Sequence, residues 1–277
     1  MRSRIRAWLA GGVLAVSAGI AQAALTDCQP PEKSQYLVFL NEPEFSSPGA
    51  FATREQMLRF FDALQEHLDQ RRDLEMAGLP VAPFRVARCV GRVPSIDGKD
   101  YTREVVRSLY NRSVVIEIWG KLDAETEGGK RVNARAQINY LLTPLRRAND
   151  EGKASVPSLH RFNYPDGEIA ATDFVDLVSN SDLLAFVATG IGMMAFDADD
   201  FPVAQQFLCA ASPRLERIRK RLETQPATKA QSETVAQLRA FVLERAGAAV
   251  KQLAASGSGG AAALLSPGDP CRERSTR

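Results

Sequence analysis

Apolar and polar residues alternate most clearly between Val114 and Leu142. Val114 to Leu122 is rich in apolar residues, and a charged loop, Asp123 to Lys130, follows it. The return segment, Val132 to Tyr140, alternates strictly. Because successive residues of a strand point to opposite faces, this stretch predicts a β-hairpin with one buried face and one polar face.

The polar face of this hairpin is the surface that the sequence favours for partner binding. If the two strands pair as a regular hairpin, the alternation of faces places Trp119 near Arg135, and Glu117 near Arg135 or Gln137. A stacked Trp–Arg pair contributes about 0.5–1 kcal/mol at an exposed site. Two interpretations stay open, a docking platform and a solvated sheet face. The candidate face comprises Glu117, Trp119, Asn133, Arg135 and Gln137.

The segment before the hairpin combines short apolar runs with two amphipathic stretches. Together with the hairpin they give the order β-α-β-α-β-β, which predicts an α+β fold. We expect a mixed β-sheet with helices on one face, because each helix must bury its apolar stripe on the sheet. The helix-free face would then be the polar one, which carries Glu117, Trp119 and Arg135. The expected elements are strands at 36–40, 84–90 and 159–164, and helices at about 53–68 and 100–109.

Apolar residues recur at helical spacing in the last third of the chain. They predict one helix that begins at Ser181, a second that restarts near Pro202, and a long amphipathic helix over 228–253. Pro213 is expected to break the second helix. The basic run that follows, 214–221, predicts a solvated helix face, and peripheral membrane contact is the less favoured alternative.

The chain therefore divides into four parts in the sequence. The first is a signal peptide, because three arginines precede an apolar run and Ala21-Gln22-Ala23 is a typical cleavage site. Cleavage after Ala23 predicts a periplasmic protein. The parts are 1–23 (signal peptide), 24–170 (α/β domain), 171–254 (all-α helical-hairpin region) and 255–277 (flexible tail rich in Gly, Ala and Ser).

Removal of the signal peptide changes the charge balance. The full chain has 35 Lys and Arg residues, and loss of Arg2, Arg4 and Arg6 leaves 32 against 33 Asp and Glu residues. The mature chain is therefore close to neutral. A general nucleic-acid binder would show a basic excess, so we expect no nucleic-acid partner.

Four cysteines remain in the mature chain, and an even number in an exported protein predicts disulfide bonds. Their wide spacing fits neither a zinc ribbon nor a Cys-x-x-Cys redox motif. We favour the pairs Cys28–Cys89 and Cys209–Cys271, because each stays inside one expected domain. A buried free thiol at one of them is the alternative.

No motif in the chain has the spacing of a catalytic, metal or cofactor site. Gly91 to Lys99 differs from a phosphate loop, because six residues separate its glycines and Asp100 follows the lysine. The two histidines, His67 and His160, have no nucleophile at a recognisable spacing. We therefore expect no enzyme activity, no catalytic residues, no metal and no cofactor.

Two resemblances extend this interpretation. The strand-loop-helix YLVFLNEPEF…TREQMLRFFDAL, the strand FRVARCV and the hairpin VVIEIWGKL…RVNARAQINYLL resemble the TolB amino-terminal/FlgO-like α/β domain of bacterial envelope proteins. That resemblance implies a role in protein interaction and no catalytic residues. Residues 181–212 are similar to one tetratricopeptide repeat, in which Gly192 and Ala204 let two helices approach closely.

These observations together predict an exported, non-enzymatic adaptor or accessory protein of the bacterial cell envelope. Its expected partners are envelope or secretion-apparatus proteins. The alternative is a periplasmic ligand-binding protein or hydrolase that uses the polar hairpin face. A pocket lined by Glu117, Arg135 and His160 together would favour that alternative.

Overall fold

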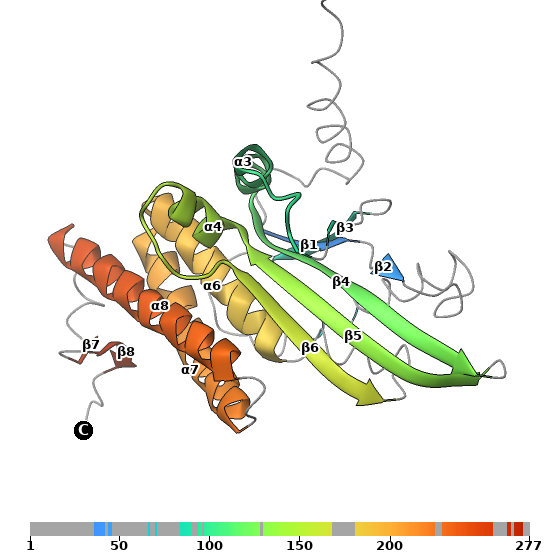
Figure 1. Ribbon diagram of the computed structural model, residues 1–277. Coiled ribbons are helices and arrows are strands. Elements are labelled where there is room, and N and C mark those ends of the chain that lie inside the picture. The colour runs from blue at the N-terminus through green and yellow to red at the C-terminus, as the bar shows by residue number, and fades with distance from the viewer. Residues whose placement is uncertain are drawn as a thin grey trace, which may run out of the picture.

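A computed structural model describes about three fifths of the chain. The described part is built from a mixed sheet, helices and a small β-ribbon (Figure 1). The signal peptide, Cys28 and the helix expected at 53–68, apart from Glu66, lie outside it. None of the helices in this part is both long enough and apolar enough to cross a membrane. The described residues are 36–41, 44–45, 66, 70, 84–89, 94–95, 97–127, 130–167, 181–224, 229–256, 265–266 and 269–273.

The sheet has six strands in the order β3-β1-β4-β5-β6, with β2 beside β4. β1 runs parallel to β3 and β4, whereas β4, β5 and β6 are antiparallel neighbours. The predicted hairpin is confirmed as β4–β5, and the strand expected at 159–164 is confirmed as β6. The strands are β1 (Leu37–Asn41), β2 (Glu44–Phe45), β3 (Arg85–Cys89), β4 (Val114–Glu127), β5 (Lys130–Leu142) and β6 (Leu159–Gly167).

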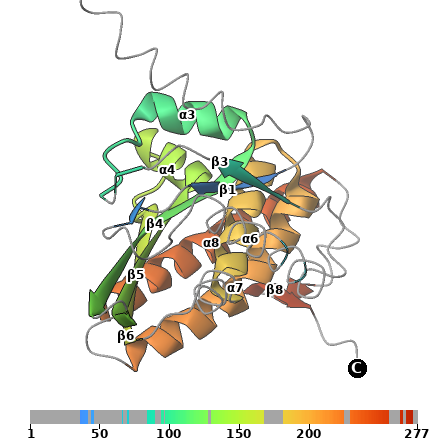
Figure 2. The same cartoon turned by 90° about the vertical axis from the view of Figure 1, so that its right-hand side faces the viewer.

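Helices cover both faces of this sheet (Figure 2). On one face, Val106 and Leu109 pack with Phe39 and Trp119. The expectation that helices cover only one face is therefore wrong. A helix-free face would leave apolar side chains of β1 and β4 in water, and their burial stabilises the fold. The described helices are α3 (Arg103–Asn111), α4 (Thr143–Asp150), α6 (Ser181–Asp197), α7 (Phe201–Glu223) and α8 (Lys229–Ala255).

On the opposite face, α6 lies at the centre of the core. All residues from 183 to 195 are buried, which is typical of a helix that is apolar on every side. Two glycines allow this depth. A Cβ at Gly190 would lie 2.9 Å from the Cβ and carbonyl oxygen of Val115, and a Cβ at Gly192 would lie 2.7 Å from Cγ of Leu208. The close approach predicted at Gly192 is therefore confirmed.

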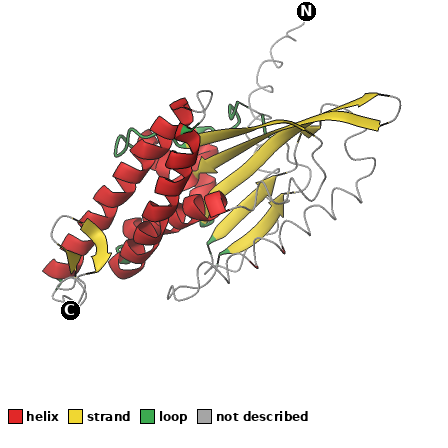
Figure 3. Ribbon diagram, turned by 90° about the horizontal axis from the view of Figure 1, so that it is seen from below, coloured by secondary structure: helices red, strands yellow, loops and turns green. Residues whose placement is uncertain are grey.

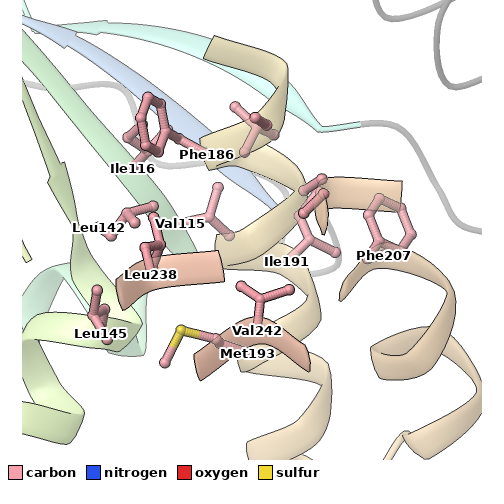
Figure 4. Close-up of a cluster of buried hydrophobic side chains, with 14 of the residues drawn as sticks. Val115, Ile116, Leu142, Leu145, Phe186, Ile191, Met193, Phe207, Leu238 and Val242 are labelled. Atoms are coloured by element: carbon pink, nitrogen blue, oxygen red, sulfur yellow. The ribbon is translucent and has the colours of Figure 1, made fainter. Parts of the chain in front are cut away.

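A single hydrophobic cluster joins the sheet to all the helices on this face. Side chains from β4, β5, α4, α6, α7 and α8 converge in it (Figure 4). The cluster crosses the boundary that the sequence places near residue 170. It includes Val115, Ile116, Leu142, Leu145, Phe186, Ile191, Met193, Phe207, Leu238 and Val242.

α7 continues through Pro213 without a break, so the helix end predicted there is wrong. Proline removes one backbone donor and disturbs the preceding turn. The carbonyl oxygen of Cys209 loses its helical donor in this way, and Nη1 of Arg214 donates to the next carbonyl oxygen, that of Ala210, at 2.6 Å. Beyond the proline, Leu215 and Ile218 are buried in the core, which keeps the helix in place.

Part of the predicted flexible tail is ordered. β7 (Leu265–Ser266) and β8 (Asp269–Glu273) form an antiparallel ribbon that contacts α7 and α8. The predicted disulfide Cys209–Cys271 is confirmed and ties this ribbon to α7. The alternative of a free thiol is wrong for these two cysteines. The pairing of Cys89 with Cys28 stays a prediction.

The glycine packing of α6 predicts opposite outcomes for two substitutions. Gly190→Ala should lower the free energy of unfolding by about 1–3 kcal/mol, because backbone and side chain of Val115 occupy the space. Gly247→Ala in α8 is the matched control, since the nearest atom, Cγ of Pro270, lies 3.9 Å away. Alanine there should raise stability by up to about 1 kcal/mol. Urea denaturation of both variants tests the packing, and equal effects would contradict it.

The disulfide predicts a second stability effect. It closes a sequence separation of 62 residues, so replacing Cys209 and Cys271 together by alanine should lower the free energy of unfolding by about 2–4 kcal/mol. Substitution is preferable to chemical reduction, because it leaves the other cysteines unchanged. An unaltered denaturation midpoint would contradict this stabilising role of the disulfide.

Candidate functional site

The base of the β4–β5 hairpin is buried on the face that the sequence analysis expects to be polar and open. Glu117 is 0 % exposed and Trp119 is 2 % exposed. The indole Nε1 of Trp119 donates to the carbonyl oxygen of Ser95 at 3.0 Å. Its ring lies 4.7 Å from that of Tyr101, tilted by 47°. Trp119 therefore anchors the segment before α3 to the sheet, and the expectation of a solvated or docking surface at these two residues is wrong.

The buried carboxylate of Glu117 accepts a hydrogen bond from an amide side chain. Asn41, at the end of β1, donates its Nδ2 hydrogen to Oε1 of Glu117. Asn139 is fully buried on β5 and accepts a hydrogen bond of 3.3 Å from Nε2 of Gln137. Buried polar groups need such partners, since burial without them costs several kcal/mol. These residues place polar side chains on one face of the sheet, and that face stays closed to solvent.

The strand register also differs from the predicted one. Trp119 pairs with Asn139, and Arg135 pairs with Asp123, so the expected proximity of Trp119 and Arg135 is wrong. Glu117 pairs with Leu141, not with Arg135 or Gln137. The reason lies at the turn. β4 continues to Glu127 through residues that the sequence assigns to a loop, which moves every cross-strand pair.

Beyond this buried base, β4 and β5 continue as a projecting two-stranded arm (Figure 3). We define the arm as residues 123–127 and 130–135. β2 accompanies β4 only as far as Leu122, and the pairing of β6 with β5 ends at Ala134. Within the described chain, most of the arm is thus a pair of strands without a further neighbour. Of the candidate residues, Asn133 and Arg135 belong to the arm, whereas Gln137 lies inside the sheet, between Lys121 of β4 and Asn163 of β6.

A second polar cluster lies where α3, α4, α6 and α8 meet. Tyr110 donates its hydroxyl hydrogen to Oδ2 of Asp197 at 2.8 Å, and the guanidinium of Arg147 lies 4.1 Å from the Tyr110 ring centre. Burial, followed by the hydrogen bond to Asp197, raises the pKa of Tyr110. Arg147 also donates from Nε to Glu151 at 2.8 Å. Hydrogen bonds from Lys153 and Arg147 lower the pKa of Glu151 to about 2.

This cluster borders a shallow pocket. Its lining includes Met193, Phe196 and Arg245 besides the charged groups of α4 and α6. The Arg245 guanidinium lies 5.3 Å from the ring centre of Phe196 and 5.0 Å from that of Phe241. It donates to the carbonyl oxygen of Lys153 at 3.3 Å. The arrangement braces four helices against each other, a role that cation–π contacts of this kind support.

The sequence analysis missed this cluster, because it assigns no helix to residues 143–150. A signal was present. Arg146 and Asp150, like Arg147 and Glu151, stand four residues apart, the spacing of ion pairs on a helix. The partner of Arg147 on α6 could not be found in this way, because no local spacing connects residues 147 and 197.

The residues that would favour a ligand-binding or hydrolytic site do not come together. Glu117 pairs with Leu141, His160 pairs with Tyr140 in the next row, and Arg135 lies several rows away. Neighbouring rows of a sheet face opposite sides. His67 and Gly91 lie outside the described residues, and at the other end of the Gly91 segment Lys99 forms an ion pair with Asp97. Within the described ranges, no group of three or more His, Cys, Asp or Glu residues could hold a metal ion.

Comparisons with known proteins add no assignment. No family model matches the chain, and no curated protein matches it.

The burial of Trp119 predicts a structural role for its side chain. Trp119→Ala should lower the free energy of unfolding by about 3–5 kcal/mol, as large-to-small changes in a core do. Trp119→Phe keeps most of the ring and removes the hydrogen bond to Ser95, at a cost of about 1–2 kcal/mol. Arg107→Ala on the exposed side of α3 is the control, with an expected change within about 0.5 kcal/mol. A native-like midpoint for Trp119→Ala would contradict the burial.

Proposed function

We propose that this protein is an exported, non-enzymatic adaptor of the bacterial cell envelope that binds a partner protein through its β4–β5 arm. The observation that carries the proposal is the contrast within one hairpin. Its base is buried between α3 and the other helices, whereas its strands run on past their neighbours (Figure 3). The buried base would hold the projecting arm in one orientation, so the arm can serve as a recognition element.

The arm offers a specific mode of binding. From Asp123 to Glu127, β4 pairs only with β5 in the described part of the chain, so its other edge can accept a partner strand. Such an edge also invites self-association, which charged residues oppose. The arm sequence is charged on both strands, with acidic residues on β4 and basic residues on β5. The acidic residues of β4 oppose pairing of this edge with the same edge of a second copy, and they favour a basic partner strand.

Three further observations support export and an envelope role. The N-terminal residues have the pattern of a signal peptide with cleavage after Ala23. The Cys209–Cys271 disulfide is typical of an oxidising compartment, such as the periplasm. The resemblance to TolB amino-terminal/FlgO-like domains implies interaction with envelope or secretion-apparatus proteins. The candidate contact residues are now Asn133, Arg135 and Gln137. Glu117 and Trp119 instead belong to the buried base of the hairpin, which supports the arm.

The proposal predicts that a shortened arm abolishes partner binding without unfolding the protein. Replacing residues 124–134 by Asn-Gly joins Asp123 to Arg135, which already face each other, through a two-residue turn. The tagged mature protein should capture a near-stoichiometric partner from gently cross-linked envelope extract. The shortened variant should retain less than about a tenth of it, with an unchanged circular dichroism spectrum.

Two further variants make this experiment decisive. Arg135→Glu keeps the arm length and reverses one charge, so it should weaken capture even if the shortened protein folds poorly. Lys251→Gln, on the exposed surface of α8, should capture the partner normally. Full capture by both arm variants would refute the proposed role of the arm.

A further inference from the structure

The shallow pocket between α4, α6 and α8 has a lining that is partly apolar and partly charged. Ala148 and Met193, both buried, and half-buried Phe196 supply the apolar part. Arg245 of α8 reaches the turn after α4, where it donates to the carbonyl oxygen of Lys153 at 3.3 Å. The lining therefore combines a guanidinium with apolar surface. We call this site the helix pocket.

The charges of the helix pocket do not cancel. Glu151 pairs with Arg147 at 2.8 Å and with Lys153 at 2.7 Å, and Asp197 lies 3.8 Å from Arg147. With Arg245, three cations line the pocket beside these two carboxylates, so one positive charge is in surplus. Within the described chain, the guanidinium of Arg245 contacts a backbone carbonyl and two aromatic rings but no carboxylate. The surplus charge therefore resides on Arg245.

Two aromatic rings hold this guanidinium in place. Its central carbon lies 5.3 Å from the ring centre of Phe196 and 5.0 Å from that of Phe241, distances at which the ring faces attract a cation. A side chain that is already held loses little freedom when a ligand binds, which favours affinity. Arg245 donates one hydrogen bond in the described structure, and a guanidinium can bind a carboxylate through two parallel N–H groups.

We propose that the helix pocket binds the carboxylate of an organic acid that carries an apolar group. The carboxylate would pair with Arg245, and the apolar group would cover Met193 and Phe196. Because the pocket is shallow, it would hold the end of a ligand rather than enclose a large one. A free small acid and the carboxyl terminus of a peptide share this chemistry.

The composition of the lining argues against other anions. Glu151 and Asp197 would repel a phosphate dianion or a strongly acidic protein surface, whereas the surplus of one positive charge matches a single carboxylate. The apolar part of the lining would gain nothing from a purely polar anion, but it gains from the burial of an apolar group.

This inference does not depend on partner binding by the arm. The helix pocket lies among the helices, whereas the arm projects at the opposite end of the molecule (Figure 3). A ligand in the pocket would contact α4, α6 and α8 and leave the arm open. The shortened-arm variant should therefore bind the ligand like the unaltered protein, so failure of the arm proposal and failure of the pocket proposal remain distinguishable.

An NMR titration of the mature protein with phenylpropionate tests this proposal. Shifts of backbone amides should be confined to residues 147–153 and 193–197 and to the surroundings of Arg245, with a dissociation constant of about 1 mM. Phenylpropionamide has the same shape without the charge, and it should bind at least about tenfold more weakly. Inorganic phosphate should produce no comparable shifts in the pocket.

Three variants locate the interaction. Arg245→Gln removes the surplus charge and should weaken phenylpropionate binding about tenfold or more. Glu151→Gln removes a repelling carboxylate and should strengthen binding roughly two- to fivefold, a gain that a poorly folded protein could not show. Arg107→Gln removes a cation from the exposed side of α3 and should leave the affinity unchanged.

The proposal is overturned if phenylpropionate and its amide bind equally, if Arg245→Gln binds like the unaltered protein, or if the shifts lie outside the pocket. The peptide acetyl-Gly-Ala-Phe distinguishes the two sources of the carboxylate. Binding of this peptide with a free carboxyl terminus, but not with an amidated one, supports the pocket and identifies a chain terminus as its ligand. Binding of phenylpropionate without binding of either peptide supports the pocket and identifies a free small acid.

Discussion

The structure depends on the close packing of α6 between the sheet and α7. Gly190 lets the helix touch the backbone of β4, and Gly192 lets Leu208 of α7 lie directly against it. Side chains at these two positions would push the three layers apart. Because α6 is buried on every side, it cannot form the surface of a separate helical unit. The sheet and the C-terminal helices consequently stabilise one another through a shared core.

The same packing determines where the molecule can bind a partner. α6 and α3 hold β4 from opposite faces, and Trp119 connects the sheet to the segment before α3. The first half of the hairpin is therefore part of the core. Only its distal half projects, and the orientation of that half is fixed by the buried base.

Much of the fold could be predicted from the sequence because local patterns determine it. Alternation revealed the hairpin, helical spacing revealed α6 and α8, and the Cys209–Cys271 pair followed from their positions. The coverage of both sheet faces could not be found by spacing, since it depends on helices far along the chain. The uninterrupted apolar run Val114-Val115-Ile116 was nevertheless a signal, because strands buried on both faces show such runs. For the candidate site, the alternation of residues identified one face of the hairpin. The cross-strand pairs could not be identified in this way, because they depend on where β4 ends.

Native-state hydrogen–deuterium exchange tests the shared core most directly. The account predicts that amides of β4 at 114–120 and of α6 at 183–195 exchange only through global opening, with the same free energy. Denaturant should change both rates in parallel, while amides of the arm exchange through smaller local openings. If α6, α7 and α8 instead exchanged as an independent unit with their own stability, the central role of α6 would be contradicted.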